Sequence, residues 1–105
     1  MTLPTQLVLQ VLVADPSAEL YGLELCRAAG LPSGTIHPIL ARLEKAGWVI
    51  SRWEEVDVHR EGRPRRRYYR VDPNSVAVVK AALHRAAPAG RLLGQLRADN
   101  AGGVS

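Results

Sequence analysis

The sequence is poor in the residues that disulfides, membrane spans and secretion signals require. Cys26 is its single cysteine, so no internal disulfide can form, and the apolar neighbours Leu25 and Ala28 favour a buried thiol over a reactive one. No apolar run approaches the roughly 20 residues that cross a bilayer, and the first residues lack the basic start and cleavage site of a secretory signal. We therefore expect a cytoplasmic protein with no membrane partner.

Catalytic and metal-binding patterns are also missing. The three histidines, His37, His59 and His84, fall on three different predicted elements. No cysteine, serine or carboxylate lies near any of them in the spacing of a nucleophile or a metal site. We expect that the protein is not an enzyme, and we predict no catalytic residue, no metal ligand and no cofactor.

Positive charge is concentrated in one stretch of a 105-residue chain whose formal net charge is only +4. Between Arg60 and Arg70 there are six arginines and one acidic residue, Glu61. This stretch alone supplies more than the whole net charge, so its position in the fold matters more than the total. The chain is long enough for one hydrophobic core and too short for a second domain of usual size.

Two helices are predicted before residue 31. Apolar residues recur with helical spacing at 4–14, where Pro4 suits a first-turn position, and Asp15-Pro16 ends the pattern. The second helix spans 21–29 and stops at Gly30. The apolar side of this second helix consists of Tyr21, Leu25, Ala28 and Ala29.

The third predicted helix has two candidate starts, because Ser33 and Thr35 can each cap it. Thr35 is the simpler cap, since it places Pro38 in the first turn, where the missing amide hydrogen has no helical partner to lose. The helix then spans about 35–46 and ends at Gly47. Its buried face consists of Ile36, Ile39, Leu40 and Leu43.

Strand-like composition follows the third helix. β-branched and aromatic residues at 48–53 and 67–71 predict two strands. The segment 57–66 between them is polar and turn-rich, which indicates a hairpin loop and no third strand. A last helix follows residue 75, with Asn74 or Ser75 as its cap.

Three helices followed by a two-stranded hairpin is the order of a winged helix-turn-helix, a mainly α (α+β) fold. In this arrangement the third helix enters the major groove of DNA. Arg42 is placed to contact guanine, His37 a base edge and Lys45 a phosphate, although an ordinary solvated helix face would also carry such residues. The outward set on this helix comprises Ser33, Thr35, His37, Pro38, Ala41, Arg42 and Lys45.

The basic loop of the hairpin favours an anionic partner, because its arginines repel one another and only Glu61 lies nearby to relieve them. Phosphates on either side of a minor groove would compensate the charge, with Arg63 or Arg65 near the tip entering the groove. A merely solubilising surface is the alternative. The wing arginines are Arg60, Arg63, Arg65, Arg66 and Arg67.

Five segments in this order and spacing resemble the PadR-like family of winged-helix transcriptional regulators. Residues 21–25 look like the opening of that family's second helix, and 33–47 is similar to its recognition helix. Residues 48–55, 62–64 and 67–71 resemble its first wing strand, wing tip and returning strand.

The resemblance implies a homodimeric regulator, typically a repressor, that places two recognition helices on a pseudo-palindromic operator. Residues 1–72 would form the DNA-binding domain, 73–97 a dimerisation helix and 98–105 a disordered tail. In several members of the family, binding of a small molecule releases the repressor. No residue pattern in this sequence identifies such an effector. Two positions depart from the family pattern, namely His37 in place of Tyr and the reversed order of Pro32-Ser33.

The last helix has an apolar stripe beyond what a three-helix core needs, which supports the dimer. The alternative is that this helix folds back as a fourth core helix. Pro88 and Gly90 are expected to break or kink it before a short continuation at Leu92, Leu93 and Leu96. The stripe predicted as the dimer interface consists of Val76, Val79, Leu83 and Ala86.

An acidic protein and RNA are the alternatives to double-stranded DNA as the partner. A winged helix can serve protein contact, with the wing arginines on an acidic partner and the outward face of the third helix buried. RNA is disfavoured because Tyr68 and Tyr69 point to opposite faces of the hairpin and leave at most one aromatic ring for stacking. Sequence-specific binding to a DNA duplex is the main hypothesis.

Overall fold

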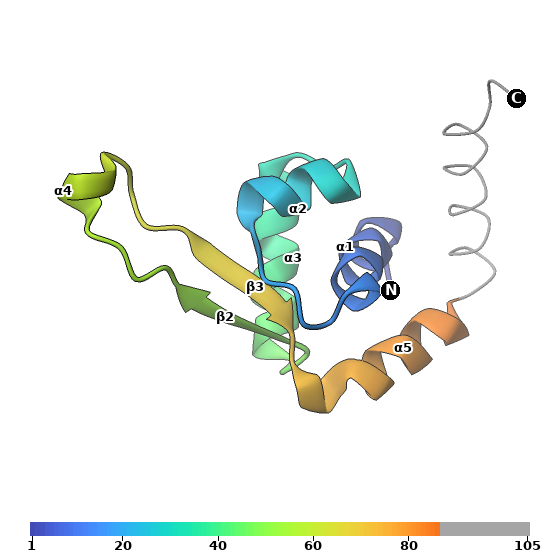
Figure 1. The fold of residues 1–105 in the computed structure, drawn as a ribbon. Coiled ribbons are helices and arrows are strands. Elements are labelled where there is room, and N and C mark those ends of the chain that lie inside the picture. Colours follow the sequence, from blue (N-terminus) through green and yellow to red (C-terminus); the bar gives the residue numbers. More distant parts are fainter. Residues whose placement is uncertain (87–105) are drawn as a thin grey trace, which may run out of the picture.

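The computed structural model describes residues 1–86 of the chain. The predictions for Pro88, Gly90, the leucines at 92, 93 and 96 and the tail 98–105 lie outside the described residues. None of the helices within residues 1–86 combines the length and the apolar character of a membrane span. The elements, shown in Figure 1, are α1 (Leu3–Ala14), β1 (Leu20–Tyr21), α2 (Gly22–Ala29), α3 (Ser33–Lys45), β2 (Val49–Trp53), α4 (Val58–Glu61), β3 (Arg67–Val71), a 3-10 turn (Pro73–Ser75) and α5 (Val76–Arg85).

Helix α1 lies at the centre of the core and contacts α2, α3, α5 and β3. Its predicted bounds and the first-turn position of Pro4 are confirmed, and the Thr2 hydroxyl accepts a hydrogen bond from the Thr5 amide at its start. Helix α2 ends as predicted at Gly30, whose φ of 69° is the left-handed conformation that glycine adopts without strain. The fully buried core side chains are Val8, Leu9, Leu12, Leu25, Ile36, Leu40, Val49, Val71 and Val79.

Two details of α2 differ from the prediction. Ala28 is exposed, so the buried side of this short helix is carried by Leu25 and Ala29. Cys26 packs against the core but is half-buried, whereas the sequence favoured a buried residue.

Helix α3 begins at Ser33, so the predicted cap at Thr35 is wrong. Pro32 occupies the cap position, and its carbonyl accepts hydrogen bonds from the amides of Thr35 (3.0 Å) and Ile36 (3.1 Å). The first turn is thus organised by a backbone carbonyl, with no side-chain cap. Pro38 consequently lies inside the helix, where it cannot donate a hydrogen bond to the carbonyl of Gly34.

The sheet has three antiparallel strands in the order β1, β3, β2. Both predicted strands are confirmed, and Trp53 opposite Arg67 and Val49 opposite Val71 mark the ends of their register. The two-residue strand β1 pairs with the other edge of β3 and was not predicted. Two residues are too few to show the alternation by which a strand is recognised.

The wing, defined here as residues 49–71, projects away from the helices (Figure 1). Its tip, predicted as an irregular loop, contains the single-turn helix α4. The Asp57 carboxylate accepts hydrogen bonds from the amides of His59 (3.0 Å) and Arg60 (3.4 Å) at the start of this turn. Gly62 ends it at a φ of 65°.

Helix α5 folds back onto the core of its own chain. Val79 is 0% exposed, and Val76 and Leu83 pack against the same core. Val79 was predicted in the dimer interface, but it is not available to a partner. The alternative of a fourth core helix therefore describes the inner side of α5. Of the two expected caps, Ser75 is the N-cap residue of α5, but its hydroxyl donates to the carbonyl of Gly47 (2.9 Å) and makes no cap bond. The Asn74 amide donates to the Asp72 carboxylate.

Candidate nucleic-acid interface

Helix α3 presents the predicted outward residues on the surface of the protein. Its apolar residues Ile36, Ile39, Leu40 and Leu43 are buried, which turns the opposite side of the helix to solvent. Thr35 is half-buried. The exposed residues of the set are Ser33, His37, Pro38, Ala41, Arg42 and Lys45.

The one carboxylate on α3, that of Glu44, is bound by the wing. Arg67 donates to both Glu44 oxygens through Nη2, at 3.1 and 3.3 Å, and its Nε donates to the Ser51 hydroxyl at 3.0 Å. Ser51 in turn donates to Glu44. This network joins the last turn of α3 to β2 and β3, and it leaves the cations of α3 without a competing acid on their own helix.

A second carboxylate, that of Glu54, organises the start of the wing loop. Arg63 donates to its two oxygens through Nη1 (2.6 Å) and Nη2 (3.2 Å), and the Arg66 amide (3.3 Å) and the Tyr68 hydroxyl (3.3 Å) also donate to it. The Arg63 guanidinium, with the Arg66 amide, lowers the pKa of Glu54 to about 2. Glu54 therefore stays charged at all physiological pH values and ties the loop to the sheet.

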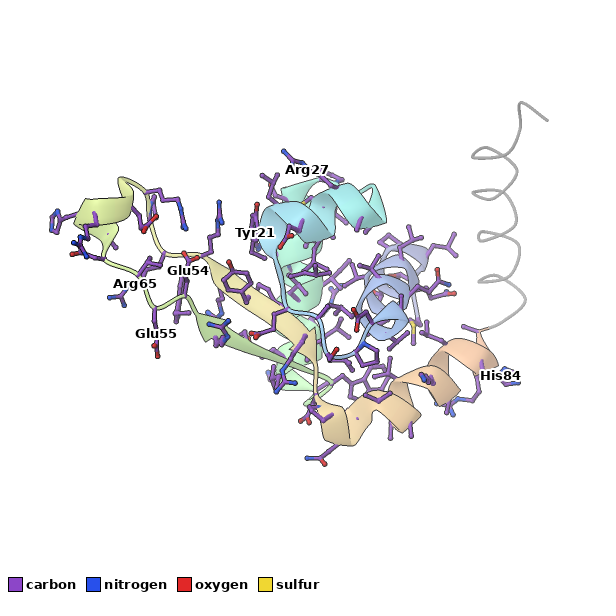
Figure 2. The ribbon with its side chains drawn as sticks, in the orientation of Figure 1. Tyr21, Arg27, Glu54, Glu55, Arg65 and His84 are labelled. Atoms are coloured by element: carbon purple, nitrogen blue, oxygen red, sulfur yellow. The ribbon has the colours of Figure 1, made fainter. Side chains whose placement is uncertain are left out.

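Aromatic rings and arginines alternate where α2 meets the wing. The Arg66 guanidinium lies 4.4 Å from the centre of the Tyr21 ring, and Tyr21 meets Tyr68 edge to face at 5.9 Å. The Arg52 guanidinium lies 5.1 Å from the centre of the Tyr68 ring and forms an ion pair with Glu19. In Figure 2 Tyr21 lies at the end of α2 nearest the wing, so this row connects α2 to the wing strands.

The prediction that only Glu61 relieves the wing arginines is wrong, because Glu54 and Glu44 bind Arg63 and Arg67. Both acids precede the basic stretch in sequence. A signal for Glu54 existed, since it lies one residue beyond Trp53, which pairs with Arg67, and therefore opposite the basic residues of the returning strand. Glu55, by contrast, is exposed and points away from α2 (Figure 2).

The five wing arginines therefore fall into different environments. Arg63 and Arg67 are held by carboxylates, and Arg66 is stacked on Tyr21. Arg60 and Arg65 are exposed, and within residues 1–86 neither guanidinium has an ion-pair partner. Of the two residues expected near the groove, Arg65 is the one left free to bind another molecule.

Most of the chain matches the model of a known protein family. The model of the transcriptional regulator PadR-like family matches residues 8–74, which is more than half of the chain and includes α3 and the wing. The chain belongs to the PadR-like family. No curated protein matches its sequence significantly. PadR-like proteins are DNA-binding regulators of transcription, so the free cations of α3 and the wing tip belong to a regulator of this kind.

Solved structures share the winged-helix fold of this PadR-like chain at low sequence identity. A PadR family transcription regulator from Clostridium difficile R20291 is 18% identical, with 90% of this chain and 98% of that chain covered and a TM-score of 0.64. A PadR-like transcriptional regulator from Bacillus cereus is 17% identical, with 88% of each chain covered and a TM-score of 0.60. The circadian clock associated protein Pex from Anabaena is 20% identical, with 88% and 83% covered and a TM-score of 0.62.

Replacing Glu54 by Gln is expected to loosen the wing loop. The pKa of Glu54 is lower in the folded protein than in an unfolded chain, so its stabilising contribution is complete above the ordinary pKa of about 4.3 and is lost as the pH falls through about 2. The amide resonance of Arg66, followed by NMR, should therefore titrate near pH 2 in the natural protein and not in the variant. Glu55→Gln is the matched control, and an equal effect of both substitutions would contradict the role of Glu54.

Proposed function

We propose that this PadR-like protein is a sequence-specific, double-stranded DNA-binding repressor that acts as a homodimer on a pseudo-palindromic operator in the cytoplasm. Residues 1–72 serve as the DNA-binding domain, and the chain from 73 to 97 serves dimerisation. Helix α3 enters the major groove, and the wing contacts phosphates and the minor groove.

The observation that carries this proposal is the engagement of Glu44. With its carboxylate bound by Arg67 and Ser51, the outward side of α3 offers Arg42, Lys45 and His37 to an anionic surface with no free acid on the same helix. A helix that must approach base edges and phosphates needs this combination of small, polar and basic groups.

The wing divides its arginines between structure and binding. Arg63 and Arg67 hold the wing in shape through Glu54 and Glu44, and Arg66 holds it against Tyr21. Arg60 and Arg65 bind DNA, with Arg65 as the residue directed to the minor groove and its phosphates.

The dimer forms on the part of α5 that its own core does not use. A hollow of about 420 Å³ lies there, lined by Met1, Trp48, Ala82, Arg85 and Ala86. Ala86 belongs to the predicted stripe and remains half-exposed, unlike Val79. A second copy of the chain would bury this hollow and bring two α3 helices to two half-sites.

Titration of the purified protein into two duplexes tests the proposal, one from upstream of its own gene and one of random sequence and equal length. At several salt concentrations, both should bind with a log-log slope of roughly −5 to −9, the value for about six to ten neutralised phosphates. The first duplex should bind far more tightly. If neither binds near physiological salt, the proposal fails and the wing serves an acidic protein partner.

Arg42→Ala should weaken binding to the preferred duplex by about 1 to 3 kcal/mol and relax sequence preference, because a bidentate contact to guanine is lost. Affinity for the random duplex should change much less. Fluorescence anisotropy with both duplexes measures the two effects. An equal loss on both would assign Arg42 to phosphate.

Arg65→Ala should weaken binding to both duplexes alike and make the salt slope shallower by about one unit for each protomer bound, because it removes one phosphate contact from each. The same titrations at varied salt measure this change. A loss confined to the preferred duplex would contradict the phosphate role. Arg63→Ala is the comparison, since that side chain is bound to Glu54 and its loss should also disturb the Arg66 amide.

Ala86→Glu should convert the dimer to monomers, because it places a charge at the edge of the hollow without entering the protomer's own core. Sedimentation velocity measures the oligomeric state, and circular dichroism checks that the fold is kept. A variant that stays dimeric and folded would show that the interface lies elsewhere.

A further inference from the structure

Gly22, the first residue of α2, lies directly against His37 of α3. A Cβ atom built on Gly22 would lie 3.1 Å from His37 Cε1 and 3.6 Å from His37 Nε2. The first distance is tighter than nine in ten real Cβ contacts, so any larger residue would displace the imidazole ring. The ring therefore lies close to the backbone at the start of α2.

Gly22 is needed for space and not for its backbone conformation. Gly30, Gly47 and Gly62 have positive φ angles, which explain the absence of a side chain there, whereas Gly22 is not among the residues with positive φ. Gly34, at the start of α3, is different again, because a Cβ built there would meet nothing within 4 Å. Contact with the His37 ring is thus the feature that sets Gly22 apart.

We propose that Gly22 is a positioning residue for DNA-sequence recognition, which it controls by supporting the imidazole of His37 at the surface of α3. This inference rests on the proposed function. His37 is exposed, and the start of α2 lies close enough to its ring to limit the positions that the ring can take. A hydrogen bond to a base edge requires donor and acceptor within about 2.7 to 3.2 Å, so a displacement of a few tenths of an ångström or a changed rotamer alters which edge the ring can reach.

The adjacent residues Tyr21 and Gly22 each lie against a side chain of a different proposed DNA-binding element. Tyr21 supports Arg66 of the wing, and the next residue supports His37 of the recognition helix. The start of α2 is thereby in contact with side chains of both proposed DNA-binding elements. Gly22→Ala should disturb only the second contact and leave the fold intact, because alanine is the better helix former.

The first experiment uses the full chain without DNA. In Gly22→Ala the ring resonances of His37 in ¹H–¹³C NMR spectra should shift, while those of His59 and His84, on other elements, should not. Gly34→Ala is the matched control, the same substitution at a helical position with open space. Unchanged His37 resonances in Gly22→Ala would overturn the proposal, as would an equal change in the control.

The second experiment selects bound duplexes from a pool with a randomised central segment, using the natural protein, Gly22→Ala, His37→Ala and the double variant. Gly22→Ala should weaken preference at the base pairs that His37→Ala affects, by roughly five- to tenfold for one base contact. In the His37→Ala background it should have no further effect, because the ring it displaces is gone.

Each outcome separates this inference from the proposed function. A Gly22→Ala effect that persists without His37 overturns the inference while DNA recognition stands. If the natural protein selects no sequence at all, the proposed function fails and this inference fails with it. Equal melting temperatures of Gly22→Ala and the natural protein exclude a general loss of stability as the cause.

Discussion

Internal pairing of arginines with two glutamates is the constraint on which the wing and the surface beside it depend. A hairpin with five arginines between residues 60 and 67 would repel itself in the folded state. Glu54 binds Arg63 and the backbone of the loop, and Glu44 binds Arg67 from the end of α3. These bonds are made by groups that are only partly exposed, so they shape the wing as well as neutralising it.

The pairing also sorts the basic residues by role. Arginines with carboxylate partners hold the wing, whereas Arg60 and Arg65 keep their charge available at its tip. Because the Glu44 carboxylate is bound by Arg67 and Ser51, Arg42 and Lys45 likewise keep their charge available on the surface of α3. A modest net charge of +4 is therefore compatible with unpaired arginines at the wing tip, because Glu44 and Glu54 are each bound to another arginine.

Much of the fold follows from local patterns. Helical spacing of apolar residues placed α1 and α2 to within a residue, and β-branched and aromatic runs placed β2 and β3. The features that were missed depend on partners elsewhere in the chain. Strand β1 exists because β3 offers it an edge, and α3 starts at Ser33 because the Pro32 carbonyl receives two amides. The inner side of α5 was assigned to a partner protomer, although Val79 fills the core of its own chain.

The sequence by itself determined the order of α1, α2, α3, β2, β3 and α5, the glycine that ends α2, the outward set on α3 and the basic character of the wing, because each of these follows from neighbours within a turn or a strand. Only the tertiary structure decided which arginines are free, that Tyr21 supports Arg66, and that Gly22 makes room for His37. The physical reason is separation along the chain. Glu44 and Arg67 are 23 residues apart, and they meet only after β2 and β3 have reversed the direction of the backbone.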